Sequence, residues 1–150
     1  MKIFLTTCLF LLMIGSNAFA VGNIDLGKGG IGYEPYHPKS ATLSLEALQR
    51  GVVYDVSCKV SDPDAQAYPA IVKFELTNGM ERSVVYFDNQ PLHTGQAKLS
   101  DNNEHTATFP GVEIFAGSNT TNLVLTWLAG DGIADPVLYD CSAYPSFGLK

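Results

Sequence analysis

Cysteine is the residue type whose placement in this sequence is most informative for chemistry. Cys58 and Cys141 each lie in a run of alternating apolar and polar residues, and both fall on the apolar side. Such alternation is typical of a half-buried strand, so both thiols are expected to point into a core. The sequence has no C-x-x-C motif and no histidine within a few positions of either cysteine, which disfavours a catalytic or metal-binding thiol. We therefore predict a Cys58–Cys141 disulfide that staples the core and plays no part in chemistry.

The histidines show no catalytic context. His37, His93 and His105 lie in turn-like or strand-edge segments, and the sequence has neither G-x-S-x-G nor H-E-x-x-H. Isolated surface histidines are therefore the expected outcome. The alternative is a hydrolase or enzyme inhibitor that uses His105 with the loop carboxylates Asp131 and Asp135.

Acidic loops raise the question of calcium, which binds through six to eight oxygens. The weak candidates are Asp101, Asn103, Asp131 and Asp135, none of which lies in a D-x-[DN]-x-[DN]-G pattern. Solvated turn carboxylates explain them better, and no metal or cofactor is expected.

Several aromatic residues lie in turn-rich segments or near the C-terminus, where they can stack on a sugar or contact a partner. The alternative is that they pack the ends of the chain onto the domain, because aromatic side chains tend to bury area. The candidate ligand-binding residues are Tyr33, Tyr36, Tyr68, Tyr144 and Phe147.

The first 20 residues have the pattern of a secretory signal peptide. Lys2 supplies the positive charge, Ile3 to Ile14 is apolar, and Ala18-Phe19-Ala20 fits an A-x-A cleavage signature. Cleavage after Ala20 would make the protein secreted or periplasmic, in a compartment where disulfides persist. The length and composition of the leader are typical of bacteria.

Charge restricts the classes of partner. Loss of Lys2 with the leader leaves eight basic and fifteen acidic residues, a net charge of about −7. Such a surface repels nucleic acid and anionic lipid. No second apolar run reaches the roughly 20 residues that span a membrane. We expect a single soluble domain, and a monomer.

The pattern of alternation predicts an all-β domain over residues 40–150. Residues 21–39 are rich in glycine, proline and tyrosine and are expected to form an irregular arm. This arm contains a formal G-x-G-x-x-G at 27–32, but no helix can follow it, because Pro35 and Pro38 come next. After the arm, about seven or eight short antiparallel strands separated by turn residues favour a β-sandwich. They are expected near residues 43–45, 52–60, 70–76, 83–87, 95–99, 105–115, 122–128 and 137–144. Pro110-Gly111 between residues 105–109 and 112–115 indicates a bend within one edge strand or a tight turn.

The segment Asp135-Pro136-Val137-Leu138-Tyr139-Asp140-Cys141 resembles the D-x-A-x-Y-x-C segment of immunoglobulin-like domains, with Val137 in the place of alanine. The resemblance covers about seven residues and implies an immunoglobulin-like sandwich, as in many small secreted bacterial proteins. It transfers no functional residue.

Together these features favour an exported, non-enzymatic binding protein at the cell surface, in the periplasm or outside the cell, with a protein or a glycan as ligand. A structural subunit of an extracellular assembly is a further alternative. It is disfavoured because residues 145–150 do not continue an alternating strand that could complement a neighbour.

Overall fold

The computed structural model describes residues 22–77, 84–114, 121–130 and 133–146. The expected leader (residues 1–20), Asp131 and Phe147 lie outside these ranges. Ten strands are found in the described part: β1 (Ile24–Ile31), β2 (Ser40–Ser44), β3 (Val53–Ser61), β4 (Ile71–Leu76), β5 (Val85–Phe87), β6 (Gln90–Leu92), β7 (Gln96–Lys98), β8 (His105–Glu113), β9 (Asn122–Ala129) and β10 (Val137–Pro145).

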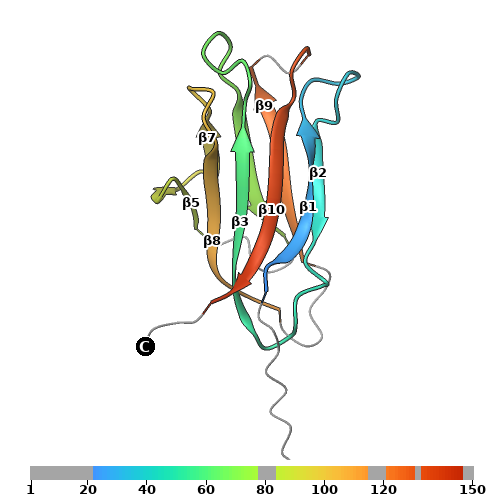
Figure 1. The fold of residues 1–150 in the computed structure, drawn as a ribbon, viewed down its shortest axis with the longest axis vertical. Helices are drawn as coiled ribbons and strands as arrows, with labels where there is room; N and C mark the ends of the chain where they lie inside the picture. Colours follow the sequence, from blue (N-terminus) through green and yellow to red (C-terminus); the bar gives the residue numbers. More distant parts are fainter. Residues whose placement is uncertain (1–21, 78–83, 115–120, 131–132, 147–150) are drawn as a thin grey trace, which may run out of the picture.

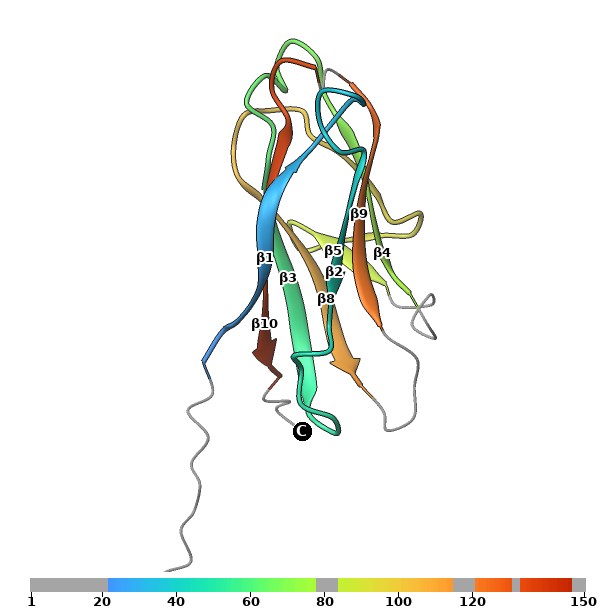
Figure 2. The same ribbon diagram turned by 90° about the vertical axis from the view of Figure 1, so that its right-hand side faces the viewer.

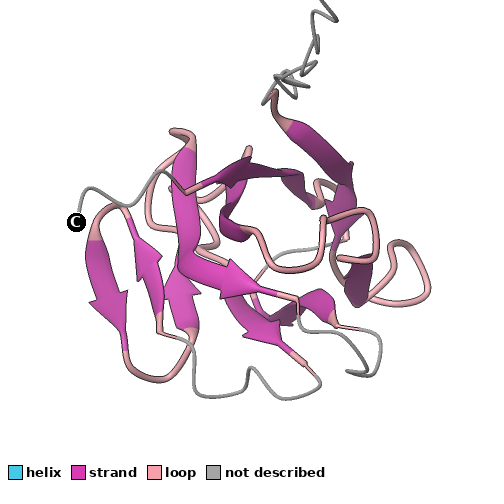
Figure 3. Cartoon of the chain, turned by 90° about the horizontal axis from the view of Figure 1, so that it is seen from below, coloured by secondary structure: helices cyan, strands magenta, loops and turns pink. Residues whose placement is uncertain are grey.

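The strands form two antiparallel sheets that pack face to face (Figures 1 and 2). Sheet A has the order β1-β10-β3-β8-β5-β6, and sheet B has the order β2-β9-β4-β7. The view along the long axis shows only strands and loops in the described residues (Figure 3). This part of the chain contains no helix long and apolar enough to cross a membrane. The predicted all-β, two-sheet architecture is confirmed, with ten strands in place of seven or eight.

Alternation along the strands builds the core between the sheets. In β3 the side chains of Tyr54, Val56, Cys58 and Val60 are buried, and the intervening residues are more exposed. Strands β4, β9 and β10 repeat this pattern, because successive side chains of a strand point to opposite faces. The inward residues of both sheets then join one hydrophobic core.

The predicted disulfide is present. Cys58 and Cys141 are directly opposite each other on β3 and β10, with Cα atoms 4.0 Å apart, and both are buried. Since β3 and β10 are neighbours in sheet A, the bond staples two strands of one sheet. It thus differs from the bridge between sheets that characterises antibody domains.

The expectation of an irregular arm over residues 21–39 is wrong for residues 24–31, which form β1 and pair with β10. This strand belongs to the sandwich, so the domain begins before residue 40. Backbone pairing with β10 holds β1 in the sheet. Because several of its residues are glycines, β1 shows no apolar alternation in the sequence. Gly29 packs against the Tyr139 side chain: a Cβ there would lie 2.7 Å from the Tyr139 hydroxyl, so the tyrosine would have to shift to admit one.

Residues Pro110 and Gly111 lie within a single strand, β8, and do not separate two strands. The register with β3 shifts between Tyr54 and Val56, which marks a bulge. Gly111 has a φ of +71°, and its N–H donates to the Asp55 carboxylate at 3.0 Å. The predicted bend within a strand is confirmed, although β8 lies inside sheet A between β3 and β5.

Candidate functional site

Four loops meet at one end of the sandwich, which we call the loop end (top of Figure 1). They span residues 32–39 (β1–β2), 62–70 (β3–β4), 99–104 (β7–β8) and 130–136 (β9–β10). The start of β1 and the end of β10 lie at the opposite end.

Direct contacts connect the loops to one another. His37 Nε2 lies 3.1 Å from the carbonyl oxygen of Ile133, which joins the β1–β2 loop to the β9–β10 loop. The backbone N–H of Gln66 donates to Asn102 Oδ1 at 3.2 Å, which joins the β3–β4 loop to the β7–β8 loop. Gly130 packs so closely on the backbone of Pro69 that no side chain fits between them. The loops therefore form one connected surface.

Three of the five predicted ligand-binding residues lie on loops of the loop end. The side chains of Tyr33, Tyr36 and Tyr68 are 47%, 64% and 61% exposed, and Ile133 beside His37 is 51% exposed. The ring of Tyr33 meets the buried Trp127 edge-on, with centroids 5.9 Å apart. Such an edge-to-face contact holds the Tyr33 ring in place.

A fourth candidate, Tyr144, does not lie at the loop end. Tyr144 lies near the end of β10, on the outer face of sheet A and away from the loop end. Phe147 lies outside the described residues.

The β3–β4 loop, which carries Tyr68, is built around the carboxyl group of Asp62. Asp62 is fully buried and accepts hydrogen bonds from the backbone N–H groups of Ala70 at 3.1 Å and Asp64 at 3.4 Å. The carbonyl of Asp64 then accepts from the N–H groups of Ala67 and Tyr68. Short acidic side chains close turns in this way because they bond to backbone a few residues away.

Burial also changes the ionisation of Asp62. Loss of hydration, and then the adjacent Asp64 carboxyl, raise the pKa of Asp62 from 3.8 to about 6, although the backbone N–H groups of Ala70 and Asp64 act in the opposite direction. Burial raises an acid pKa because the charged form loses its hydration. Protonation near pH 6 thus changes a group that shapes the loop under Tyr68.

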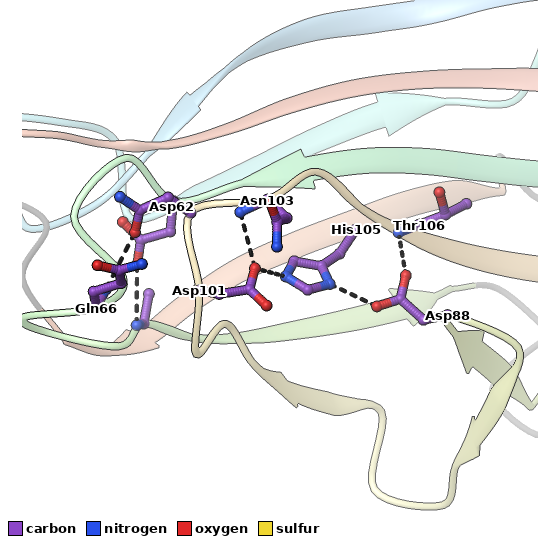
Figure 4. Close-up of polar contacts among 9 residues, drawn as sticks. Asp62, Gln66, Asp88, Asp101, Asn103, His105 and Thr106 are labelled. Atoms are coloured by element: carbon purple, nitrogen blue, oxygen red, sulfur yellow. Dashed lines mark hydrogen bonds and ion pairs between the residues drawn. The ribbon is translucent and has the colours of Figure 1, made fainter.

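His105, at the start of β8, lies between two carboxylates (Figure 4). Its Nδ1 is 2.6 Å from Asp88 Oδ2 and its Nε2 is 2.9 Å from Asp101 Oδ1. Asp88 also accepts from the N–H of Thr106, and Asp101 from the N–H of Asn103. The cluster ties the β5–β6 turn and the β7–β8 loop to sheet A.

This geometry favours the imidazolium form of His105, in which both ring nitrogens donate. Partial burial lowers the pKa of His105, but the hydrogen bonds and charges of Asp88 and Asp101 outweigh it and raise the pKa above 6.5. The backbone N–H of Asn103, with His105, lowers the pKa of Asp101. Phe87 stacks on the His105 ring, with centroids 5.2 Å apart. A ring whose two nitrogens are both occupied has no lone pair free for general-base catalysis.

The four calcium candidates do not form a described site. Asp101 is engaged by His105 and Asn103, whereas Asp135 lies in a different loop and Asp131 lies outside the described residues. Over the ranges that the structure describes, no group of three acidic, histidine or cysteine side chains is placed to hold a metal ion.

A cavity of about 460 Å³ opens between β4 and the β5–β6 hairpin. Apolar side chains that include Phe74, Leu76 and Phe109 line its inner part, and the predicted surface residue His93 lies on its wall. At its rim the Lys73 ammonium pairs with the Glu75 carboxylate at 2.7 Å.

Asp62 and Asp88 were not singled out by the sequence analysis. For Asp88 a signal was available, since Asp and Asn are among the residues that most readily adopt the positive φ angles of a two-residue hairpin turn. Asp88 and Asn89 do have positive φ angles, of 46° and 66°. For Asp62 the sequence gives only a turn, and its burial depends on how the loop packs.

Comparisons with known proteins are sparse. No protein-family model matches the chain, and no curated protein matches it. A solved structure of a carbohydrate-binding module, CBM36, in complex with calcium and xylotriose shows a likeness with a TM-score of 0.37 and 11% sequence identity, over 81% of this chain and 98% of that chain. A likeness this distant assigns neither a family nor a ligand.

Proposed function

We propose that this protein is an exported, non-enzymatic binding protein that captures a partner at its loop end. The observation that carries the proposal is that Tyr33, Tyr36 and Tyr68, which are 47–64% exposed, and the exposed Ile133 all lie on loops at one end of the sandwich. Export is supported by the leader pattern of residues 1–20 and by the Cys58–Cys141 disulfide, since disulfides persist mainly outside the cytosol.

The chemistry of the loop end suits a protein surface best. Tyrosine offers a large, rigid contact area with a polar tip, and it is enriched among the residues that dominate binding energy. Ile133 adds a branched apolar side chain, and the loops project beyond the ends of the sheets (Figure 2). Connections between the loops reduce the entropy lost on binding, because the surface is already ordered.

A photo-crosslinking experiment tests this proposal. A benzophenone amino acid placed at position 36 or 68 should form the same adduct with one protein of the extracellular or envelope fraction. The same group placed at Tyr86, which is 38% exposed on β5, is the matched control and should not form that adduct. Adducts that are absent, or equal at all three positions, would overturn the proposal.

Affinity for the crosslinked protein provides the second readout. Tyr36→Ala and Tyr68→Ala together should weaken binding at least tenfold, since each hot-spot truncation costs about 1 kcal/mol or more. Tyr86→Ala should leave the affinity unchanged. A parallel glycan array distinguishes a protein ligand from a glycan ligand. If the protein binds the array and binding depends on Tyr36 and Tyr68, the ligand of the loop end is a glycan and not a protein.

The alternative of a hydrolase based on His105 is not favoured by the geometry, because Asp88 and Asp101 occupy both of its ring nitrogens.

A further inference from the structure

A second concave surface lies on the outer face of sheet A, away from the loop end. Alternate residues of β10 point outward, so Asp140, Ser142 and Tyr144 form a line along this strand. This line and residues of the flanking strands enclose a groove of about 270 Å³. The groove is lined by Asn23, Asp25, Lys59, Asp140, Ser142 and Tyr144.

The hydrogen-bonding groups of the groove are fixed by their neighbours. Asp25 lies opposite Ser142, and one of its carboxylate oxygens accepts from the N–H of Gly27 at 2.9 Å. The Ser142 hydroxyl donates to the Tyr144 hydroxyl oxygen at 3.3 Å. Because that oxygen is already an acceptor, the phenol hydrogen of Tyr144 is available to donate to a ligand.

The charges of the groove select against ions. Asp140 has Lys28 opposite it on β1 and Lys59 opposite it on β3, so residues of both charges alternate across these three strands. Lys59 is also 3.3 Å from Glu104. This alternation offers no concentrated charge for a metal ion, and the net charge of −6 for the chain repels anions at long range. A neutral ligand with many hydroxyl groups fits this pattern.

The remaining feature of the groove is the aromatic ring of Tyr144. The Tyr144 side chain is 41% exposed at the edge of the groove, beside carboxylates that can accept from hydroxyl groups. A sugar ring presents C–H groups that stack on an aromatic face and neighbouring hydroxyls that donate to a carboxylate. The volume lies just below the roughly 300–1,000 Å³ of pockets for drug-sized ligands, which matches a single sugar ring.

We propose that this groove is a binding site for a neutral saccharide, with Tyr144 as the stacking residue and Asp140 and Asp25 as acceptors. The site goes beyond the capture of a protein at the loop end. Its residues lie on or beside strands β1, β3 and β10, and none of them belongs to the four loops.

An NMR titration of the ¹⁵N-labelled full chain tests the site. Methyl glucoside, methyl galactoside, methyl mannoside and N-acetylglucosamine are the probes, and glucuronate is the anionic comparison. At least one neutral sugar should give saturable shifts at residues 23–28, 57–59 and 140–144, with a dissociation constant on the order of millimolar. Glucuronate should bind at least tenfold more weakly, because Asp25 and Asp140 oppose its carboxylate.

Substitutions in and outside the groove test whether the sugar binds there. Tyr144→Ala and Asp140→Ala should each weaken sugar binding at least tenfold, whereas Tyr86→Ala and Asp135→Asn should not change it. All four positions are exposed, and the dispersion of the NMR spectrum checks that each variant is folded. Shifts that fail to saturate for every neutral sugar, or that persist in both groove variants, would overturn the site. The same titration with Tyr36→Ala should be unchanged, so failure of the groove and failure of the loop end are distinguishable.

Discussion

Asp62 and His105 are titratable side chains held in hydrogen-bond networks, and both bind a proton more tightly in the folded chain than in the unfolded chain. The pKa of His105 is raised above 6.5, so its contribution to stability is complete below pH 6.5 and is lost as the pH rises through the folded value. The pKa of Asp62 is raised from 3.8 to about 6, so folding is penalised progressively as the pH rises from about 4 to 6. Both groups therefore favour folding at mildly acidic pH.

Urea unfolding between about pH 3.5 and 8 measures the Asp62 contribution. Asp62→Asn loses one backbone hydrogen bond and should be about 1 kcal/mol less stable than wild type at the acidic end. The gap should close or reverse between about pH 4 and 6 and stay level above pH 6, because the cost of the buried Asp62 carboxylate to the wild type grows over that window to on the order of 2–3 kcal/mol. A gap that is independent of pH would contradict the raised pKa.

His105→Gln should show a different dependence on pH in the same experiment. Its loss of stability relative to wild type should be largest below pH 6.5 and should shrink as the pH rises, because only the imidazolium donates to both Asp88 and Asp101. His93→Gln, at an exposed position, is the control and should give a small difference at every pH. A His105→Gln difference that grows with pH would contradict the charged bridge.

At the scale of residues, the sequence predicted which residues are available for contact better than it predicted which residues lie beside one another in the fold. Tyr33, Tyr36 and Tyr68 were candidates because tyrosines in loops are available for contact, but their placement at one end of the molecule depends on which loops share that end of the sandwich. The two carboxylates beside His105 come from a turn and a loop that are separate in the sequence. Such neighbours are set by the order of the strands, which alternation does not encode.

At the scale of elements, the close approach of Gly130 to the β3–β4 loop gives a direct test of how the loop end is assembled. Gly130 has a φ of +106°, and a Cβ there would lie 2.6 Å from Ala70 Cα and 2.7 Å from the Pro69 carbonyl oxygen. Gly130→Ala should therefore lower the free energy of unfolding by about 2–4 kcal/mol, through backbone strain and the clash together. Equilibrium denaturation measures this change.

Gly111→Ala is the matched control for that substitution. Gly111 also has a positive φ, of +71°, but a Cβ there would meet nothing within 4 Å. It should cost only about 1 kcal/mol, the strain of a left-handed backbone. Equal losses for the two variants would show that packing against Ala70 is not what places the β9–β10 loop.

Strands with regular alternation were predictable, because one face of each meets the core. Strands β3, β4, β9 and β10 lie close to their expected ranges, and the shared inward phase of Cys58 and Cys141 correctly predicted their disulfide. Strand β1 was missed because its glycines give the sequence no alternation of side chains. What holds these residues in an extended strand is their backbone pairing with β10. Strand β6 was missed because three residues are too few to show a period.

At the scale of the whole molecule, the lengths of the edge strands bear on self-association. In the described sheets, the edge strands β6 and β7 have three residues each and β2 has five, whereas β1, the other edge of sheet A, has eight and carries Asp25 and Lys28. Short edges offer few unpaired backbone groups to a second copy, and charged side chains on the long edge oppose pairing with one. We expect a monomer at micromolar concentration by native mass spectrometry and light scattering. A stable dimer or longer assembly would instead support the structural-subunit alternative.

The pairing of the first strand with the last also determines how the molecule would respond to mechanical tension. Ile24 lies opposite Ala143, so a pull on the two ends of the described chain would open the β1–β10 ladder from that end, one pair at a time. Within this ladder Cys141 lies opposite Gly27, and there the Cys58–Cys141 bond connects the two pulled segments directly. While that bond is intact, residues 59–140 are outside the load path, and extension is confined to residues 22–58 and 141–146. Under oxidising conditions the bond would thus limit how far the domain can be stretched and would shield the β3–β4, β7–β8 and β9–β10 loops from the load.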